Sequence, residues 1–270
     1  MANLLEQKKA LDEFLASYNL IQKINLEDTK LLVKESLDYY SRKSGEPSFL
    51  KSLTDKWYES LLEGEPDYSI YDDDLYFIDL WSCWTIYSRK YLKSVKSYTP
   101  VFNMIKESDS IVDLGCGIGY TTALLKQMFP EVSVWGTNIP GTRQYDFCKS
   151  MAEKYGFIVA PDVESVPQGV VSIFASEYFE HIEKPLEHLQ EILDRLNPKT
   201  LVIANAFNTR TPGHFLEYKD HNEKIPQEKI SKRFNTVFLG KGYKKVKTPF
   251  WNNRPNVWVK VIGSTGFGFV

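Results

Sequence analysis

The chain has 270 residues, of which 43% are hydrophobic and 25% are charged, and its formal net charge is −2. These values are ordinary for a globular protein and exclude a nucleic-acid-binding protein that works through overall positive charge. No run of 18 apolar residues is present, so we expect no membrane-spanning helix. The first residues lack the apolar core of a signal peptide, and the three cysteines are scattered, so the sequence predicts a reduced, cytoplasmic setting.

The first hundred residues carry apolar side chains at a spacing of three to four, which predicts helices. The expected helices cover residues 4–18, 26–40, 48–62 and 75–95. Gly-Glu-Pro runs at 45–47 and 64–66 separate the second from the third and the third from the fourth. We therefore expect an N-terminal helical lobe over residues 1–100.

From about residue 100 the pattern changes to alternating strands and helices, which predicts an α/β domain with a parallel sheet and right-handed crossovers over residues 101–270. The expected strands cover residues 110–114, 133–137, 157–160, 170–175 and 200–204. A final pair, at 243–248 and 256–262, has the pattern of an antiparallel hairpin.

A glycine-rich turn follows the first of these strands, in the run Asp113-Leu-Gly115-Cys-Gly117-Ile-Gly119. Glycine lets the backbone turn sharply and lets a ligand approach it without a Cβ in the way. The N–H groups at the start of the next helix favour an anionic or polar ligand. The spacing G-x-G-x-G differs from the G-x-G-x-x-G of dinucleotide-binding proteins.

This run resembles the first motif of the class I S-adenosylmethionine (SAM)-dependent methyltransferases, and three later segments strengthen the match. The resemblance implies a Rossmann-like sheet of seven strands that ends in an antiparallel hairpin, and it implies SAM as the cofactor. It places Asp113 and the three loop glycines at the methionine part of SAM.

Two further segments fall where the family binds the nucleoside. The family usually has Asp or Glu after the second strand to accept hydrogen bonds from the ribose hydroxyls, whereas this chain has Asn138. An amide accepts without charge, which weakens such bonds and leaves open a modified SAM or another nucleoside. The segment 160–167 resembles an Asp-x-x-x-x-Pro loop, which places Asp162 at the adenine amino group and Val163 beside the ring. The alternative is a surface aspartate in a turn.

The segment after the fourth strand resembles the family's Glu-x-x-Glu-His sequence. His181 is the candidate general base, because imidazole titrates near neutral pH. Glu177, Glu180 and His181 are spaced so that one helical turn could aim all three at one point, and His214 or His221 could add a fourth ligand. Such a set suits a divalent metal. It is similar to metal-assisted O-methyltransferases of ubiquinone synthesis and of small RNAs, although the segment is common in the superfamily without metal.

Two segments are candidates for binding the methyl acceptor. In the last N-terminal helix, Trp84, Tyr87 and Tyr91 are spaced to share a face that could cover the pocket and contact a planar acceptor. The alternative is that this face docks the helical lobe on the sheet. Beyond the fifth strand, Asn208 and Arg210 are expected at the mouth of the pocket.

The segment 219–260 is basic, with eleven Lys or Arg against three Asp or Glu. Cations with interleaved aromatic residues can bind nucleic acid. The sequence therefore predicts a SAM-dependent methyltransferase that acts on an oxygen or nitrogen of a small molecule. The alternatives are a methyltransferase that modifies RNA or DNA and a non-catalytic binding protein with the same fold.

Overall fold

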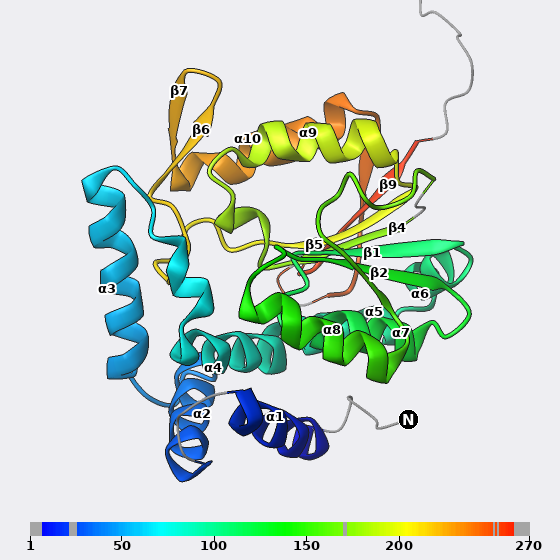
Figure 1. Ribbon diagram of the computed structural model, residues 1–270. Helices are drawn as coiled ribbons and strands as arrows, with labels where there is room; N and C mark the ends of the chain where they lie inside the picture. The colour runs from blue at the N-terminus through cyan, green and yellow to red at the C-terminus, as the bar shows by residue number, and fades with distance from the viewer. Residues whose placement is uncertain (1–6, 22–25, 170–171, 251, 253, 262–270) are drawn as a thin grey trace, which may run out of the picture.

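The computed structural model describes residues 7–21, 26–169, 172–250, 252 and 254–261. A single seven-stranded sheet lies between two layers of helices, with α9 and α10 on one face and α5, α7 and α8 on the other (Figure 1). Helices α1 and α2 lie beyond α4, on the side away from the sheet (Figure 1). The chain therefore has the mixed α/β architecture that the sequence predicts.

The N-terminal helices follow the predicted pattern closely. They are α1 (Gln7–Ile21), α2 (Leu26–Tyr40), α3 (Ser48–Glu63), η1 (Tyr68–Asp72), α4 (Asp74–Cys83), η2 (Trp84–Ser88), α5 (Arg89–Ser97) and α6 (Thr99–Lys106). Asp73 begins α4 by accepting a hydrogen bond from the backbone N–H of Leu75 at 2.9 Å, an ordinary N-cap. The single helix expected at 75–95 is interrupted, because η2 is π-helical.

The sheet has the strand order β3-β2-β1-β4-β5-β9-β8. Its strands are β1 (Ser110–Leu114), β2 (Ser133–Thr137), β3 (Ile158–Ala160), β4 (Ser172–Ser176), β5 (Thr200–Ala204), β8 (Tyr243–Val246) and β9 (Asn256–Lys260). The first five are parallel, and β9 runs antiparallel to both β5 and β8. The predicted sheet and its closing hairpin are confirmed, although residues 170, 171 and 262 lie outside the described part.

The remaining elements connect these strands. They are α7 (Tyr120–Met128), α8 (Arg143–Tyr155), η3 (Phe179–His181), α9 (Pro185–Leu196), the hairpin of β6 (Glu217–Asp220) and β7 (Glu223–Pro226), and α10 (Gln227–Gly240). The hairpin was not predicted, because its two strands have four residues each and only Tyr218 and Ile225 are buried in them. It projects from the end of the sheet beside α3 and α10 (Figure 1).

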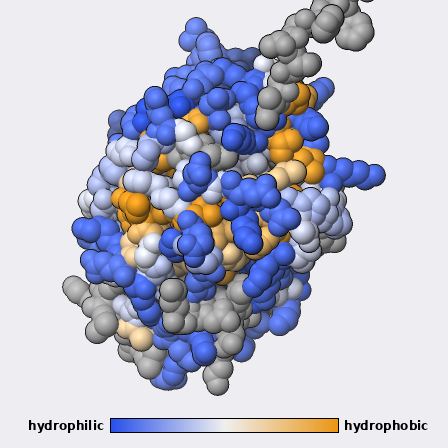
Figure 2. Space-filling view, turned by 90° about the vertical axis from the view of Figure 1, so that its right-hand side faces the viewer, coloured by the Kyte–Doolittle hydropathy of each residue, from blue (hydrophilic) through white to orange (hydrophobic). Residues whose placement is uncertain are grey.

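The hydrophobic core is shared between the N-terminal helices and the sheet. One buried cluster extends from Phe14 of α1 and Trp81 of α4 to Phe129 and Val257 of the sheet region. On the face shown in Figure 2, hydrophilic side chains surround scattered apolar ones. No helix in the described part of the chain combines the length and the apolar character that a membrane crossing needs. The division into two domains at residue 100 stays a prediction.

Candidate functional site

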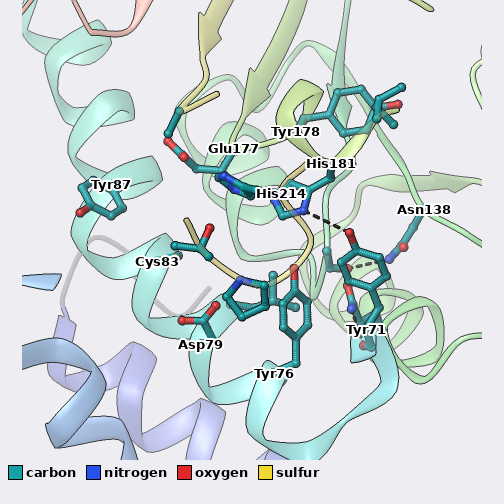
Figure 3. Close-up of a pocket in the computed structure, with 18 of the residues that line it drawn as sticks. Tyr71, Tyr76, Asp79, Cys83, Tyr87, Asn138, Glu177, Tyr178, His181 and His214 are labelled. Carbon is teal, nitrogen blue, oxygen red and sulfur yellow. Dashed lines mark hydrogen bonds between the residues drawn. The ribbon is translucent and has the colours of Figure 1, made fainter. Parts of the chain in front are cut away.

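A cavity of about 1340 Å³ lies at the carboxyl ends of the parallel strands. Gly115, Thr137 and Glu177, which stand at or just beyond the ends of β1, β2 and β4, line one wall. Residues of α2, η1, α4 and α5 line the opposite wall (Figure 3). Open α/β sheets bind ligands in the crevice outside the carboxyl ends of their strands, so this is the expected place for a site.

The glycine loop forms part of the cavity wall. Gly115 and Gly117 both line it, and both have positive φ, +62° and +52°. A Cβ added to Gly115 would overlap the ring of Tyr178, so only glycine fits there. The backbone N–H of Gly115 donates to Oγ1 of Thr137 at 3.0 Å, which joins the loop to β2. Gly119 begins α7 behind this wall and does not reach the cavity.

Asp113 lies behind the glycine loop rather than in the cavity wall. Its side chain is buried, and Oδ2 accepts a hydrogen bond from the hydroxyl of Thr122 at 2.6 Å. Burial raises the pKa of Asp113 to about 7. The residue therefore braces the strand end beneath the loop, and any effect of it on a ligand is transmitted through the loop or through water.

Asn138 lines the cavity and closes back on the glycine loop. Its Nδ2 donates to the carbonyl of Gly117 at 2.6 Å, and its Oδ1 accepts from the backbone N–H of Ile139 at 2.9 Å. Ile139 is 65% exposed and lines the same cavity, where it offers an apolar surface to a flat ring. The sequence analysis missed Ile139, although its place directly after Asn138 was a usable signal.

The loop after β3 completes this half of the cavity. Asp162 and Val163 both line it, and the backbone N–H of Asn138 donates to the carbonyl of Ala160 at 3.1 Å. Oδ1 of Asp162 accepts from the backbone N–H of Ser165 at 2.7 Å. Hydrogen bonding from the side chain of Ser165, and next from this backbone N–H, lowers the pKa of Asp162. The structure therefore brings together the glycine loop, expected at the methionine part of the cofactor, and the two segments expected at the nucleoside.

The prediction of one helical turn that contains Glu177, Glu180 and His181 is wrong. Only Phe179–His181 form a 3-10 turn, and Glu177 stands outside it with a left-handed φ of 52°. Glu177 and His181 line the cavity, whereas Glu180 is completely buried, and its Oε1 accepts from the backbone N–H of Ala206 at 2.6 Å. Burial raises the pKa of both carboxyl groups. Glu180 thus anchors the segment after β5.

The residues considered as metal ligands are not gathered into one set. In the part of the chain that the structure describes, the group with three candidate ligand atoms within 4.8 Å of one another is Glu187, Asp220 and His221. That group lies on the surface at the β6–β7 turn, away from the cavity. No such group of three ligand atoms is found among the described residues Glu177, Glu180, His181 and His214. The geometry therefore gives no support to a divalent metal in the cavity.

His181 and His214 face each other edge to face, with ring centroids 4.7 Å apart (Figure 3). Nδ1 of His181 lies 3.1 Å from the hydroxyl of Tyr71, and Nδ1 of His214 lies 2.9 Å from the carbonyl of Thr209. Burial, with the field of His214, lowers the pKa of His181 well below its usual range, and burial lowers that of His214 to about 4. Both imidazoles are therefore neutral at pH 7.

Two of the three aromatic residues expected at the acceptor lie in the cavity wall. Tyr87 and Tyr91 line it, and the Tyr91 hydroxyl is 3.5 Å from Oε1 of Glu177. Trp84 is buried instead and packs against Tyr120, with ring centroids 4.9 Å apart. The wider turn of the π-helical segment is the reason, because it rotates Trp84 away from the face that Tyr87 and Tyr91 share.

Asn208 and Arg210 lie outside the cavity. Both are exposed, and the guanidinium of Arg210 lies over the ring of Tyr58 at 4.7 Å and 3.5 Å from Oδ1 of Asp55. Neighbouring residues of the same segment, such as Thr209, do line the cavity. The prediction thus had the right segment and the wrong side chains. In an irregular loop no periodicity tells which side chains point toward the cavity and which point toward solvent.

Within the helical lobe, the sequence analysis missed the contribution of α4. Asp79 of α4 lines the cavity and is buried, and its Oδ1 accepts from the hydroxyl of Tyr40 at 2.6 Å. Burial raises the pKa of Asp79 to about 7. Tyr76 and Cys83 on the same helix line the cavity beside it (Figure 3). The signal was present, because Asp79 is a lone acid in an otherwise apolar stretch of helix.

The basic segment 219–260 is partly neutralised by acidic residues. Among the described residues, four of its cations form ion pairs: Lys219 with Glu183, Lys224 with Glu217, Arg233 with Glu223, and Lys241 with Asp194. All four pairs lie on the outside of the molecule, at β6, β7 and α10. Such pairing leaves a weaker positive surface than the residue count suggests.

Residues 84–241 match the family model described as a methyltransferase domain. A trans-aconitate 2-methyltransferase of Rhodopseudomonas palustris strain BisA53 is 32% identical over 92 residues, which are 33% of this chain and 34% of that protein. The same-named protein of strain BisB18 is 27% identical over 111 residues, which are 39% of this chain and 42% of that protein. The matches thus span less than half the length of these curated relatives.

Among solved structures, the S-adenosylmethionine-dependent methyltransferase SibL in its apo form is similar at 15% identity and a TM-score of 0.49. That similarity covers 86% of this chain and 74% of the other. The mitomycin 7-O-methyltransferase MmcR is similar at 13% identity and a TM-score of 0.44, over 86% of this chain and 67% of the other.

Proposed function

Because the chain belongs to the methyltransferase-domain family of the class I superfamily, we propose that it transfers a methyl group from SAM to an oxygen or nitrogen atom of a small molecule. One observation carries this proposal. A single cavity joins the glycine loop, Asn138 and Asp162 on one side to Glu177 and His181 on the other. A cofactor and an acceptor held in the same cavity are close enough for direct transfer.

The residues of the first half fit SAM. The backbone of Gly117 faces the cavity without a Cβ, Ile139 offers an apolar surface for adenine, and Asp162 lines the cavity with a carboxylate that can accept from the amino group of adenine. Asn138 also lines the cavity, and beside its bonds to Gly117 and Ile139 its amide keeps a second N–H and a second oxygen lone pair for the ribose hydroxyls. When bound, SAM supplies an electrophilic methyl group on a positively charged sulfur.

The residues of the second half position the acceptor. Methyl transfer is a displacement at carbon, so the protein mainly orients the attacking atom and removes its proton where it has one. His181 is neutral at pH 7 and lines the cavity, so it can hold and accept that proton. Glu177, at the end of β4, is the second group that can hold an acceptor hydrogen.

We favour a small acceptor over a nucleic acid. The site lies between the sheet and the helical lobe, and the cations of the basic segment are largely on other surfaces and partly ion-paired. We propose SAM as the cofactor and no role for a divalent metal in the transfer. The proposal also includes a reducing, cytoplasmic setting, which the three free cysteines support.

The test combines cofactor binding with methyl transfer. We expect SAM and its product S-adenosylhomocysteine to bind the purified protein in calorimetry, and labelled methyl groups to pass from SAM to members of a panel of phenols and amines. His181→Asn is expected to keep the affinity for S-adenosylhomocysteine and to slow transfer by roughly 10²-fold or more, the usual loss when a general base is removed. His221→Asn, on the exposed hairpin, is the matched control.

Three outcomes decide between this proposal and its alternatives. A protein that binds neither SAM nor its product does not perform this reaction. A protein that binds SAM tightly but methylates no acceptor in the panel is the non-catalytic binding protein instead. Steep salt dependence of binding to RNA or DNA would favour the nucleic-acid alternative.

A further inference from the structure

Resting on the proposed methyl transfer, we propose that the acceptor carries a positively charged nitrogen, which binds against the carboxyl group of Asp79 in the helical lobe. This nitrogen is a recognition group and not the atom that receives the methyl group. The acceptor is thus an amine that spans the cavity from Asp79 to Glu177 and His181.

Asp79 is the first observation that points to such a ligand. Its side chain is only 6% exposed, yet it lines the cavity. Oδ1 accepts from the Tyr40 hydroxyl at 2.6 Å, but no lysine or arginine of the described chain forms an ion pair with Asp79. A buried carboxylate without a counter-charge is unfavourable, and burial accordingly raises its pKa to about 7. A cationic ligand would supply the missing charge.

Several tyrosine rings line the same cavity as this carboxyl group and suit the same ligand. Tyr40 and Tyr87 lie edge to face with ring centroids 5.7 Å apart, and Tyr87 stacks on Tyr91 at 6.4 Å. Tyr76, one turn before Asp79 on α4, lines the cavity beside Asp79 (Figure 3). The faces of aromatic rings attract ammonium groups, more strongly when water is excluded.

Two carboxyl groups, Asp79 and Glu177, act on the same thiol in this part of the cavity. Cys83 lies one turn after Asp79 on α4, and the charges of both Asp79 and Glu177 raise the pKa of its thiol in addition to burial. Glu177 also feels the positive charge of Arg254, which lowers its pKa and partly offsets the effect of burial. Asp79 has no such neighbour, so it is the carboxyl group that needs an external cation.

The entrance of the cavity limits the kind of amine. Arg42, Lys90 and Lys93 line the cavity and are exposed, so they would repel a polycation. They favour an acceptor with a single cationic nitrogen whose other end is neutral or anionic. A protonated nitrogen has no free electron pair for attack on a methyl group. The methylated atom therefore lies at the opposite end, near Glu177 and His181.

The test uses three probes that share a phenol ring and differ in charge: tyramine, N-acetyltyramine and 3-(4-hydroxyphenyl)propionate. Their binding is measured by calorimetry to the full chain, with and without saturating S-adenosylhomocysteine. We expect tyramine to bind at least about tenfold more tightly than either other probe, as a charge-assisted hydrogen bond to a buried group provides.

Variants connect this preference to the proposed site. Asp79→Asn is expected to abolish the preference for tyramine and to keep the affinity for S-adenosylhomocysteine. Tyr40→Phe, which keeps the ring and removes the hydroxyl that holds Asp79, is expected to reduce the preference in part. Asp38→Asn is the control, because Asp38 lies on α2 with exposed partners, Lys34 and Lys43, and does not line the cavity.

The amine proposal is overturned if the propionate binds as tightly as tyramine, if none of the probes binds, or if Asp79→Asn leaves the preference intact. These outcomes are separate from the proposed function. A wild-type protein that does not bind S-adenosylhomocysteine contradicts the proposed methyl transfer. The preference among the three probes is also measured in the absence of S-adenosylhomocysteine, so it can be judged separately.

Discussion

Asn138 makes two hydrogen bonds that an aspartate at the same position could not both make. Its Nδ2 donates to the carbonyl of Gly117, and its Oδ1 accepts from the N–H of Ile139. A carboxylate has no donor and would place a negative charge against the Gly117 carbonyl. The amide is therefore explained by the structure of the glycine loop, and a change of cofactor is not needed to account for it.

Replacement of Asn138 tests this explanation. We expect Asn138→Asp to lower the free energy of unfolding of the unliganded protein by about 1–2 kcal/mol, because the Gly117 carbonyl loses its partner and meets a like-charged one. Urea unfolding measures this change. Asn222→Asp, at the exposed β6–β7 turn, is the matched control and should change stability little. Equal stability of Asn138→Asp and wild type would contradict the explanation.

The raised pKa of Asp79 makes stability depend on pH. Burial raises this pKa from 3.8 to about 7, so between these values the folded chain holds a proton that the unfolded chain has released. The stability that Asp79 contributes is complete below the unfolded pKa and is lost as the pH rises through the folded pKa. Asparagine keeps an oxygen that can accept from Tyr40 but does not ionise.

We therefore expect Asp79→Asn to become more stable than wild type as the pH rises from about 4 to about 8. The gain should be on the order of a few kcal/mol, since one pKa unit corresponds to about 1.4 kcal/mol. Urea unfolding of both proteins at each pH gives the difference, in which the contributions of His181 and His214 cancel. A difference that does not vary with pH would show that Asp79 titrates normally.

At the scale of elements, the glycine loop is where the backbone and the cavity wall meet most tightly. Alanine at Gly115 would need a left-handed backbone and would also overlap the ring of Tyr178. Gly141 also has a positive φ, +81°, but nothing lies within 4 Å of an added Cβ. Alanine there costs only the free energy of the left-handed backbone. The pair of substitutions therefore separates the two effects.

We expect Gly141→Ala to cost about 1 kcal/mol of stability, from the left-handed conformation alone. Gly115→Ala should cost roughly 1–3 kcal/mol more, because a well-packed side chain must move. It should also weaken the binding of S-adenosylhomocysteine, which Gly141→Ala should not. Calorimetry gives the affinity for S-adenosylhomocysteine and urea unfolding gives the stability. Equal effects of the two substitutions would show that the Tyr178 ring moves aside at no measurable cost.

The sequence predicted an element well where its pattern of apolar residues was regular, and poorly where no regular pattern was present. Buried strands such as Ser110–Leu114 and Thr200–Ala204 are apolar runs between turns, and their limits were predicted to the residue. Glu177 was assigned to a helix because its spacing from His181 fits one, but spacing does not reveal a left-handed φ at a strand end. Asp79 was overlooked because its carboxyl group meets Tyr40 from a helix 39 residues away.

At the scale of the whole molecule, the helical lobe is clamped to the sheet region beside the cavity. The guanidinium of Arg143, at the start of α8, donates to Oδ1 of Asp74 at 2.6 Å and to the carbonyl of Asp72 at 2.9 Å. The indole N–H of Trp57 in α3 donates to the carbonyl of His214 at 2.6 Å. Both walls of the cavity are thus held by contacts between distant parts of the chain.

Removal of this clamp should affect ligand binding. We expect Arg143→Ala to weaken S-adenosylhomocysteine binding several-fold and to destabilise the protein by about 1 kcal/mol, a modest value because the pair is partly exposed. Lys154→Ala is the control, since Lys154 joins α8 to Glu13 of α1 and does not line the cavity. Unchanged ligand affinity in Arg143→Ala would mean that the clamp does not hold the cavity wall.

The π-helical segment Trp84–Ser88 has a consequence for how the acceptor preference of such a chain can change. It directs Trp84 into the core while Tyr87 and Tyr91 face the cavity. Five residues in the wider π-helical turn rotate the chain by about as much as four α-helical residues, so loss of one residue from this segment would return it to ordinary helical geometry and leave α5 facing the cavity as it does now. Tyr91, Lys90 and Lys93 would then keep their places, so a single deletion could change the side chains that the segment itself presents to the acceptor while α5, the sheet and its glycine loop stayed as they are.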